Sequence, residues 1–240
     1  MLNDYVVIDL EMTGLNAKKD KILEVAAVRV REGKEIETFS AIVDSGVRLS
    51  DKVMELTGIT QEQADAGMAY DETVQKFLEF LGEDVLVGQN VIFDFSFLKQ
   101  WAVNHKIALE KQAVDTLKLA RKFLPPGQKK DLGSLCAYFE IPRVNAHRAL
   151  DDARETLQIF ERLKQLYGKE QEAAFAPGPL LYKAKKQSPA TERQKMYLKR
   201  FAQSHGIVLE DFSPMMTKSE ASRLTDQLIA QYGKMQNFEV

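Results

Sequence analysis

The 240-residue chain has little cysteine, no long apolar run and no large excess of either charge, and each scarcity excludes a class of protein. The single cysteine, Cys136, excludes an intramolecular disulfide and a cysteine-rich zinc site, and it fits a reducing cytoplasm. No segment approaches the roughly 18 consecutive apolar residues of a membrane-spanning helix. The first residues lack the basic-then-apolar pattern of a secretory signal peptide, so we expect a cytoplasmic location and no membrane association.

The formal net charge of −2 conceals an uneven distribution of charge along the chain. Residues 1–167 contain 22 basic and 27 acidic side chains, whereas residues 168–240 contain 11 and 8. The two parts therefore carry net charges of −5 and +3, and the near-neutral total does not argue against a nucleic-acid partner. Residues 168–190 contain three prolines and show no sustained apolar period, so we expect a linker between a domain at 1–167 and a module at 191–240.

Hydrophobic periodicity predicts an α/β fold for the first of these parts. Short runs rich in β-branched residues predict strands, and apolar residues three and four apart predict helices. Three strands come first, and strands then alternate with helices, which is typical of a mixed β-sheet flanked by helices. We expect strands over 5–10, 22–30, 37–43, 85–87 and around 113–114, and helices over 71–81, 93–104, 132–139 and a long segment ending near 167.

The C-terminal module is expected to form a small helical hairpin, whose role the sequence leaves open. Thr191 with Gln194, and Thr217 with Glu220, each match the capping box that begins a helix. Apolar stripes at helical spacing would pack the two helices together.

The first acidic motif, formed by Asp9 and Glu11, lies at the end of the first predicted strand. Because successive side chains of a strand point to opposite faces, these two carboxylates share one face. On a buried face they repel each other and lose hydration, and a divalent cation between them relieves both costs. The alternative is a strand that ends at Leu10, which would make Glu11 a solvated turn residue.

Two further acidic motifs follow. Asp94 lies among phenylalanines at the start of a predicted helix, where it needs a partner unless its charge simply favours the helix dipole. On a continuous helix His147 and Asp152, five residues apart, would differ by roughly 140° in direction. They converge only if His147 lies in the loop before the helix, which Pro142 upstream allows; otherwise both face solvent.

Four carboxylates and one histidine together favour hard, oxygen-ligated cations, Mg²⁺ or Mn²⁺, over zinc. A pair of such ions about 3.5–4 Å apart can activate a water and stabilise the leaving oxygen of a phosphodiester. A histidine beside the metals is the natural base for the proton of that water.

Three ordered motifs resemble those of the DnaQ-like (DEDDh) 3′–5′ exonuclease family, proofreading type: Asp9-x-Glu11, Asn90-x-x-x-Asp94 and His147-x-x-x-x-Asp152. Residues 58–60, 114–117 and 130–135 resemble further parts of the family pattern, so that the resemblance covers about residues 4–167. It implies an RNase H-like mixed sheet flanked by helices. It also implies that two Mg²⁺ or Mn²⁺ ions per site are bound by Asp9, Glu11, Asp94 and Asp152, and that His147 is the general base.

The same resemblance implies a set of substrate-binding residues. The 3′-terminal nucleotide would meet Met12, Thr13, Gly14 and Leu15, and the strand would pass Asn90 and Phe97. Two positions depart from the family pattern. Gln89 stands where many relatives have histidine, and Asp151 adds a second acid beside Asp152, which leaves open which of the two binds metal.

The expected function is hydrolysis at the 3′ end of single-stranded DNA with release of nucleoside monophosphates, in proofreading or repair. Residues 8–15 are also similar to the start of oligoribonucleases, so a 3′–5′ exoribonuclease of short RNA is an alternative. A non-catalytic nucleic-acid-binding subunit of a polymerase is another, and the expected protein partner is a polymerase or replication protein. Residues 183–200 carry seven basic side chains and one acidic, and form either an arm along the substrate strand or a solvated surface.

Overall fold

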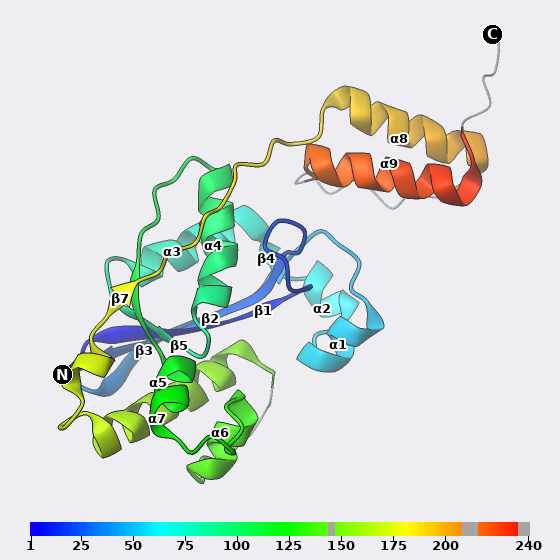
Figure 1. Cartoon of the computed structure of the whole chain (residues 1–240). Coiled ribbons are helices and arrows are strands. Elements are labelled where there is room, and N and C mark those ends of the chain that lie inside the picture. Colours follow the sequence, from blue (N-terminus) through cyan, green and yellow to red (C-terminus); the bar gives the residue numbers. More distant parts are fainter. Residues whose placement is uncertain (144–146, 208–215, 235–240) are drawn as a thin grey trace. The chain divides into compact units, whose positions relative to one another are not determined.

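The computed structural model describes residues 1–143, 147–207 and 216–234, and the chain divides into two compact units (Figure 1). The first comprises Met1–Ala184 and the second Lys185–Val240. Residues 208–215 and 235–240 of the predicted module lie outside the described residues. Within the described ranges, no helix combines the length and the apolar character needed to cross a bilayer.

The first unit is built around a mixed seven-stranded sheet with the order β4-β3-β2-β1-β5-β6-β7. Strand β1 pairs antiparallel with β2 and parallel with β5, which places it in the middle of the sheet. The predicted mixed sheet is confirmed. The strands are β1 (Tyr5–Met12), β2 (Ile22–Arg31), β3 (Lys34–Asp44), β4 (Met68–Ala69), β5 (Leu86–Gly88), β6 (Gln112–Asp115) and β7 (Gly178–Pro179).

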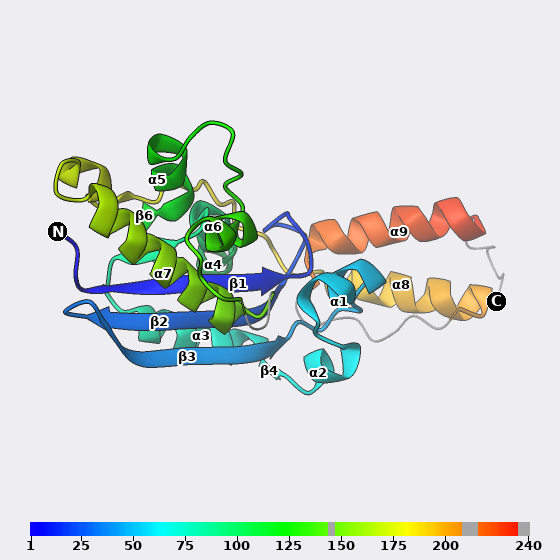
Figure 2. The same ribbon diagram turned by 90° about the horizontal axis from the view of Figure 1, so that it is seen from below.

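Helices cover both faces of this sheet (Figures 1 and 2). Val6 and Ile8 of β1 belong to the apolar cluster beneath α3 and α4, whereas Tyr5 and Val7 belong to the cluster beneath α5, α6 and α7. Strand β1 is thus buried on both faces, as its continuous apolar run indicates. The helices of this unit are α1 (Asp51–Thr57), α2 (Gln61–Asp65), α3 (Tyr70–Leu81), α4 (Ile92–Asn104), α5 (Thr116–Phe123), α6 (Leu132–Tyr138) and α7 (Ala149–Tyr167).

The expected linker is divided between the two units. Residues 168–184 belong to the first unit, where they form a 3-10 helix (Glu172–Phe175) and the edge strand β7 beside β6. Phe175 is 2% exposed and packs against Phe160, and the backbone N–H of Leu180 donates to Lys111 O at 2.9 Å. Two isolated apolar anchors hold this proline-containing segment, and they are too sparse to produce a periodic signal.

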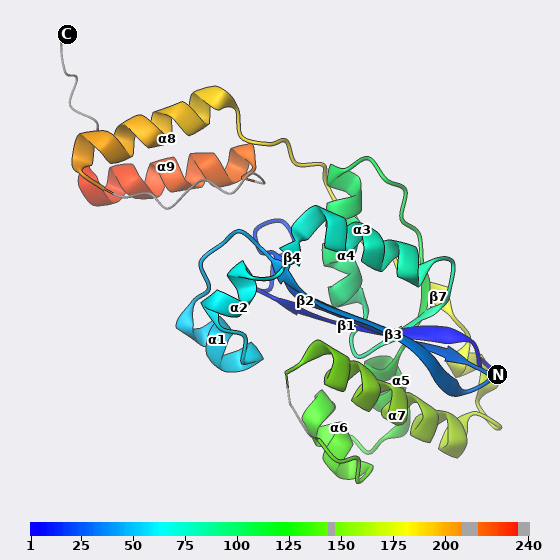
Figure 3. The ribbon, with the colours of Figure 1, turned by 180° about the vertical axis from the view of Figure 1, so that it is seen from behind.

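The described part of the second unit forms two helices, α8 (Glu192–His205) and α9 (Lys218–Tyr232), and both predicted capping boxes are formed. Their first residues lie at the same end, because Ala190 N–H donates to Met216 O at 2.7 Å and Lys218 N–H to Ser188 O at 2.9 Å. The helices therefore run side by side in the same direction (Figure 3), and the expected hairpin, in which they would be antiparallel, is wrong. Leu198, Phe201, Ala221 and Leu228 form the core between them.

Candidate active site

The two carboxylates of the first motif lie at the C-terminal end of β1. The strand continues to Met12, so Glu11 is a strand residue and not part of a solvated turn. By the alternation of the strand, Asp9 and Glu11 lie on the same face as Val7, the face that α7 covers. Both side chains are half-buried, as the sequence pattern predicts for a pair that shares one face.

Asp94 approaches this strand from the first turn of α4. Strand β5 pairs with β1 at Val6 and Val7, and beyond this point the backbone N–H of Leu10 donates to Asp94 Oδ1 at 3.1 Å. The Asp94 side chain is 5% exposed, and this burial raises its pKa to about 7, with a smaller contribution from the charge of Asp115. Asp94 thus lies on the backbone of the residue between Asp9 and Glu11.

His147 and Asp152 converge in the way that their spacing requires. Helix α7 begins at Ala149, so His147 precedes it, in a turn with a left-handed backbone (φ 65°). His147 is exposed and Asp152 is buried. The ligand atoms of Glu11, His147 and Asp152 all lie within 4.8 Å of one another. The neighbouring Asp151, which the sequence leaves as an alternative, is not in this group of three.

Burial, together with neighbouring negative charges, raises the pKa values of Asp9 and Glu11. Burial is the main cause of the raised pKa of Glu11, about 8, and the charges of Asp152, Glu24 and Asp94 add to it. Burial and the charges of Asp94 and Glu11 also raise the pKa of Asp9 well above its ordinary value. Crowded oxygen donors of this kind fit a divalent cation, whose charge removes the cost of ionising them together. The carboxylate–histidine cluster, defined as Asp9, Glu11, Asp94, His147 and Asp152, can therefore hold such an ion.

Sequence reasoning missed Glu24 and Arg148, which support this cluster. Glu24 of β2 lies opposite Glu11 and is 1% exposed. It accepts hydrogen bonds from Arg148 Nη2 at 2.9 Å and from the backbone N–H of Ala149 at 3.1 Å. It thereby fixes the start of α7, directly after His147, to the sheet. A signal was present, since Glu24 is an acid within an apolar strand, as unusual as Asp94 in its helix.

Arg143 and Glu155 form a second supporting pair that the sequence did not indicate. Arg143 donates from Nη2 to Asp152 Oδ1 and from Nε to Glu155 Oε2, each at 2.8 Å. Glu155 is 3% exposed, one turn after Asp152 on α7. Because these partners come together only in the folded chain, no local pattern announces them.

The predicted substrate-binding residues fall into two groups. Met12, Thr13 and Gly14 are half-buried, while Leu15 is 85% exposed, an unusual position for a large apolar side chain. Asn90 is exposed in the turn before α4, with a left-handed backbone (φ 61°). Phe97 is only 3% exposed and packs in the core, so its burial argues against direct contact with a nucleic acid.

Gln89, which stands where many relatives have histidine, makes specific bonds beside Asp94's helix. Its Nε2 donates to Lys130 O at 2.7 Å, and its Oε1 accepts from Thr116 Oγ1 at 2.5 Å. The backbone N–H of Asn90 donates to Asp115 Oδ1 at 3.0 Å. These bonds fix the turn from β5 into α4. Their partners lie in residues 114–117 and 130–135, two of the segments that resemble further parts of the family pattern, so these segments have a structural role.

The RNase T exonuclease family model matches residues 6–160. The chain belongs to this exonuclease family. This membership confirms the expected DnaQ-like (DEDDh) family and the expectation of an exonuclease.

PolC-type DNA polymerase III of Clostridium perfringens is 38% identical over 167 residues, which cover 68% of this chain and 12% of the polymerase. The Bacillus subtilis PolC-type polymerase is 36% identical over 164 residues, covering 66% of this chain and 11% of the polymerase. The chain thus spans a small part of the polymerases that it matches.

Solved exonuclease structures share the fold of the first unit. The nuclease domain of 3′hExo, a DEDDh family member solved with bound rAMP, has a TM-score of 0.60 at 21% identity, covering 73% of this chain and 96% of that domain. Escherichia coli exonuclease I in complex with a dT13 oligonucleotide has a TM-score of 0.60 at 18% identity, covering 72% and 43%. At these identities the likeness shows the fold alone, and it confirms the predicted RNase H-like architecture.

Proposed function

We propose that the first unit is a metal-dependent 3′–5′ exonuclease that releases nucleoside monophosphates from single-stranded DNA. The observation that carries the proposal is the convergence of Glu11, His147 and Asp152, whose ligand atoms lie within 4.8 Å of one another. Asp94 accepts a hydrogen bond from the Leu10 N–H, and burial, followed by the charges of Asp94 and other cluster members, raises the pKa of Asp9. These contacts and charges support a single site formed by the four carboxylates and the histidine of the DEDDh pattern.

The four carboxylates of the cluster would hold two Mg²⁺ or Mn²⁺ ions, since hard oxygen donors suit these cations better than zinc. When bound, the ions would acidify a water and stabilise the negative charge on the leaving oxygen. Glu11 and Asp94 have pKa values of about 8 and 7. Both must therefore lose a proton near neutral pH in order to bind the ions.

His147 is the residue we assign to proton transfer. Its ring nitrogen lies within 4.8 Å of carboxylate oxygens of Glu11 and Asp152, and its side chain is exposed. An exposed imidazole can accept a proton from an attacking water at the cluster and pass it to solvent. The Glu24–Arg148 and Glu24–Ala149 bonds hold the residues that follow His147, which limits the movement of its turn.

DNA is the favoured substrate because two relatives that are more than a third identical are DNA polymerases. This likeness supports a role in proofreading or repair beside a polymerase partner. The highly exposed Leu15, three residues after the end of β1, offers an apolar surface to the base of a 3′-terminal nucleotide. Thr13, two residues earlier, is fixed because its backbone N–H donates to Lys21 O and its Oγ1 accepts from Lys21 N–H, both at 2.9 Å.

The test is the degradation of single-stranded DNA labelled at its 5′ end, in Mg²⁺, followed as a ladder that shortens from the 3′ end. We expect Asp9→Ala, Asp152→Ala and His147→Ala each to reduce the rate by roughly a hundredfold or more, since even outer partners of a metal site contribute 10–100-fold. Asp151→Ala is the matched control and should retain most of the activity. Degradation by Asp152→Ala at the parent rate would refute the proposal.

A second candidate is a 3′–5′ exoribonuclease, which the similarity of residues 8–15 to oligoribonucleases favours. The same assay on short DNA and RNA of one sequence separates the two, because the 2′-hydroxyl is the only difference between the substrates at each sugar. A kcat/KM at least tenfold higher for the RNA would replace DNA as the assigned substrate.

A further inference from the structure

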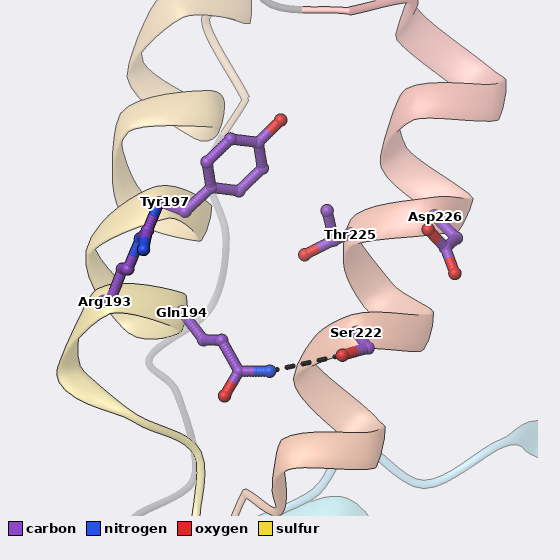
Figure 4. A pocket seen from close by; sticks show the side chains of 6 residues that line it. All are labelled: Arg193, Gln194, Tyr197, Ser222, Thr225 and Asp226. Carbon is purple, nitrogen blue, oxygen red and sulfur yellow. Dashed lines mark hydrogen bonds between the residues drawn. The ribbon is translucent and has the colours of Figure 1, made fainter.

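A pocket between the two helices of the second unit takes no part in the proposed hydrolysis. Its volume is about 310 Å³, and its walls come from the N-terminal half of α8 and the middle of α9 (Figure 4). This volume lies at the lower end of the roughly 300–1,000 Å³ of small-ligand sites and suits one planar group better than a large molecule. The lining residues are Arg193, Gln194, Tyr197, Ser222, Thr225 and Asp226.

Gln194 fixes the spacing of the two helices at this pocket. Its Nε2 donates to Lys218 O at 3.1 Å and to Ser222 Oγ at 3.2 Å. Its Oε1 accepts from the backbone N–H of Thr191 at 3.0 Å as part of the capping box. Because one amide ties both helix starts together, the pocket is preformed and does not require the helices to separate.

The pocket walls combine an aromatic ring with small polar groups. Figure 4 shows the ring of Tyr197 directed toward α9, across from Thr225. Ser222 accepts from Gln194, so its hydroxyl proton can still be donated, and Thr225 donates to Ala221 O at 2.8 Å, which leaves its oxygen as an acceptor. A π-face together with one donor and one acceptor matches the face and edge of a nucleobase.

Positive charge continues from the pocket along α8. Arg193, Tyr197 and Arg200 are spaced i, i+4 and i+7, so they form one stripe on the helix. Neither arginine makes an ion pair within the parts of the chain that the structure describes, and both are exposed. They stand seven residues apart, about 10 Å along the axis, which corresponds to about three nucleotides of a stacked strand at 3.4 Å each.

We propose that the second unit binds single-stranded nucleic acid, with one base against Tyr197 in the pocket and the flanking phosphates on Arg193 and Arg200. The pocket favours an extended strand over an acidic peptide, because the Tyr197 ring with one donor and one acceptor beside it matches the face and edge of a nucleobase. The stripe explains why it fits better than a free nucleotide, because its second arginine lies beyond the pocket. The binding is independent of hydrolysis at the carboxylate–histidine cluster.

A circular single-stranded oligonucleotide tests this proposal in the full chain. A fluorescent dT30 circle has no 3′ end for the proposed exonuclease site, and EDTA prevents any cleavage, so failure of the proposed function would not affect the result. Fluorescence anisotropy then gives the Kd as a function of salt. We expect Arg193→Ala combined with Arg200→Ala to weaken binding about tenfold and to reduce the salt slope by about 1.4, roughly 0.7 for each phosphate contact on a single strand.

Tyr197→Leu tests the pocket while retaining apolar packing in the second unit. It should weaken binding at least fivefold, the lower limit for the loss of one stacked base, with an unchanged salt slope. A circle of the same length with abasic sites should bind the parent as weakly as dT30 binds Tyr197→Leu. An rU30 circle should bind comparably, since stacking does not read the sugar.

The matched control is Arg223→Ala, which removes one exposed positive charge of α9, at a position about 100° around that helix from Ser222. It should change the Kd less than twofold. Equal affinities of the parent and the double arginine variant for dT30 would overturn the proposal. Parent affinity that is the same for the dT30 and the abasic circles would overturn the base pocket, because the strand would then be held by charge alone.

Discussion

Arg143 Nη2 donates a hydrogen bond of 2.8 Å to Oδ1 of Asp152, one of the carboxylates proposed to bind metal. The same guanidinium donates through Nε to Glu155, also at 2.8 Å. The side chains of Asp152 and Glu155 are only 8% and 4% exposed, whereas that of Arg143 is 25% exposed. One cation thus compensates two nearly buried charges that lie three residues apart on α7.

Arg143→Ala should destabilise the first unit, because it leaves two buried carboxylates without a counter-charge. The expected loss is about 3 kcal/mol in the free energy of unfolding, typical of breaking a buried pair from one side. Urea denaturation followed by circular dichroism measures it. The control is Arg154→Ala, whose pair with Glu35 is 43% and 34% exposed and should contribute less than about 1 kcal/mol. Equal losses in the two variants would contradict this account.

Glu24→Gln should weaken the attachment of α7 to the sheet. Glu24 accepts three N–H groups, two from Arg148 and one from Ala149, and a glutamine amide would turn a donor toward some of them. Leaving buried donors unpaired costs about 1–3 kcal/mol, so we expect a loss of about 2 kcal/mol in unfolding free energy.

The same variant should lower kcat about tenfold with little change in KM, as expected for a partner that orients others. Glu37→Gln, on a side chain that is 52% exposed and paired with Arg29, is the control. Parent-like kcat in Glu24→Gln would show that the start of α7 positions His147 without Glu24.

The part of the site that follows local rules could be predicted from the sequence. The alternation of side chains placed Asp9 and Glu11 on one face, and the 3.6-residue period required His147 to precede its helix. Glu24 and Arg148, in contrast, are 124 positions apart and meet only because β2 and α7 pack together. No periodicity carries such information, so the supporting residues of the site could not be derived from the pattern alone.

The errors in the predicted fold have a similar origin. Residues 168–184 resemble a linker because they contain two prolines and two glycines, while their two buried anchors, Phe175 and Leu180, show no periodicity. The apolar stripes of α8 and α9 predict that the two helices pack together, but a stripe is the same whichever way its partner runs. The direction is set by the backbone bonds of Ala190 and Lys218, which join the two helix starts.

Gly88→Ala should disturb the connection from β5 to α4, the helix that carries Asp94. A Cβ at Gly88 would lie 2.8 Å from Val91 Cβ and 3.3 Å from Ile8 O, between α4 and β1. Neither neighbour is a flexible side-chain end, so we expect a destabilisation of about 1–3 kcal/mol from overpacking. Thermal unfolding measures the loss, and Gly127→Ala, where no atom lies within 4 Å of the added Cβ, is the control. Equal melting temperatures for the parent and Gly88→Ala would contradict the close approach.

The raised pKa values of the cluster predict how stability depends on pH in EDTA. The pKa of Glu11 rises from its ordinary 4.5 to about 8, and that of Asp94 from 3.8 to about 7. At pH values between the ordinary and the raised pKa of each group, the folded chain binds more protons than the unfolded chain. Stability therefore falls as the pH rises through this range. Calorimetry in EDTA should therefore show the melting temperature decreasing from pH 5 to pH 8, and Asp94→Asn should flatten that decrease.

Divalent cations should oppose this fall in stability with rising pH. Because binding requires ionised carboxylates, Mg²⁺ competes with protons at pH 5 and binds more readily at pH 8. The increase in melting temperature on adding Mg²⁺ should therefore be larger at pH 8, by the ordinary linkage of a ligand to the folded state. Glu72→Gln, on an exposed carboxylate whose pKa is lowered by Lys76, should leave both dependences unchanged. A melting temperature in EDTA that rises from pH 5 to pH 8 would contradict the raised pKa values of these carboxylates. It would also mean that their crowding in the folded chain does not favour a cation at this position.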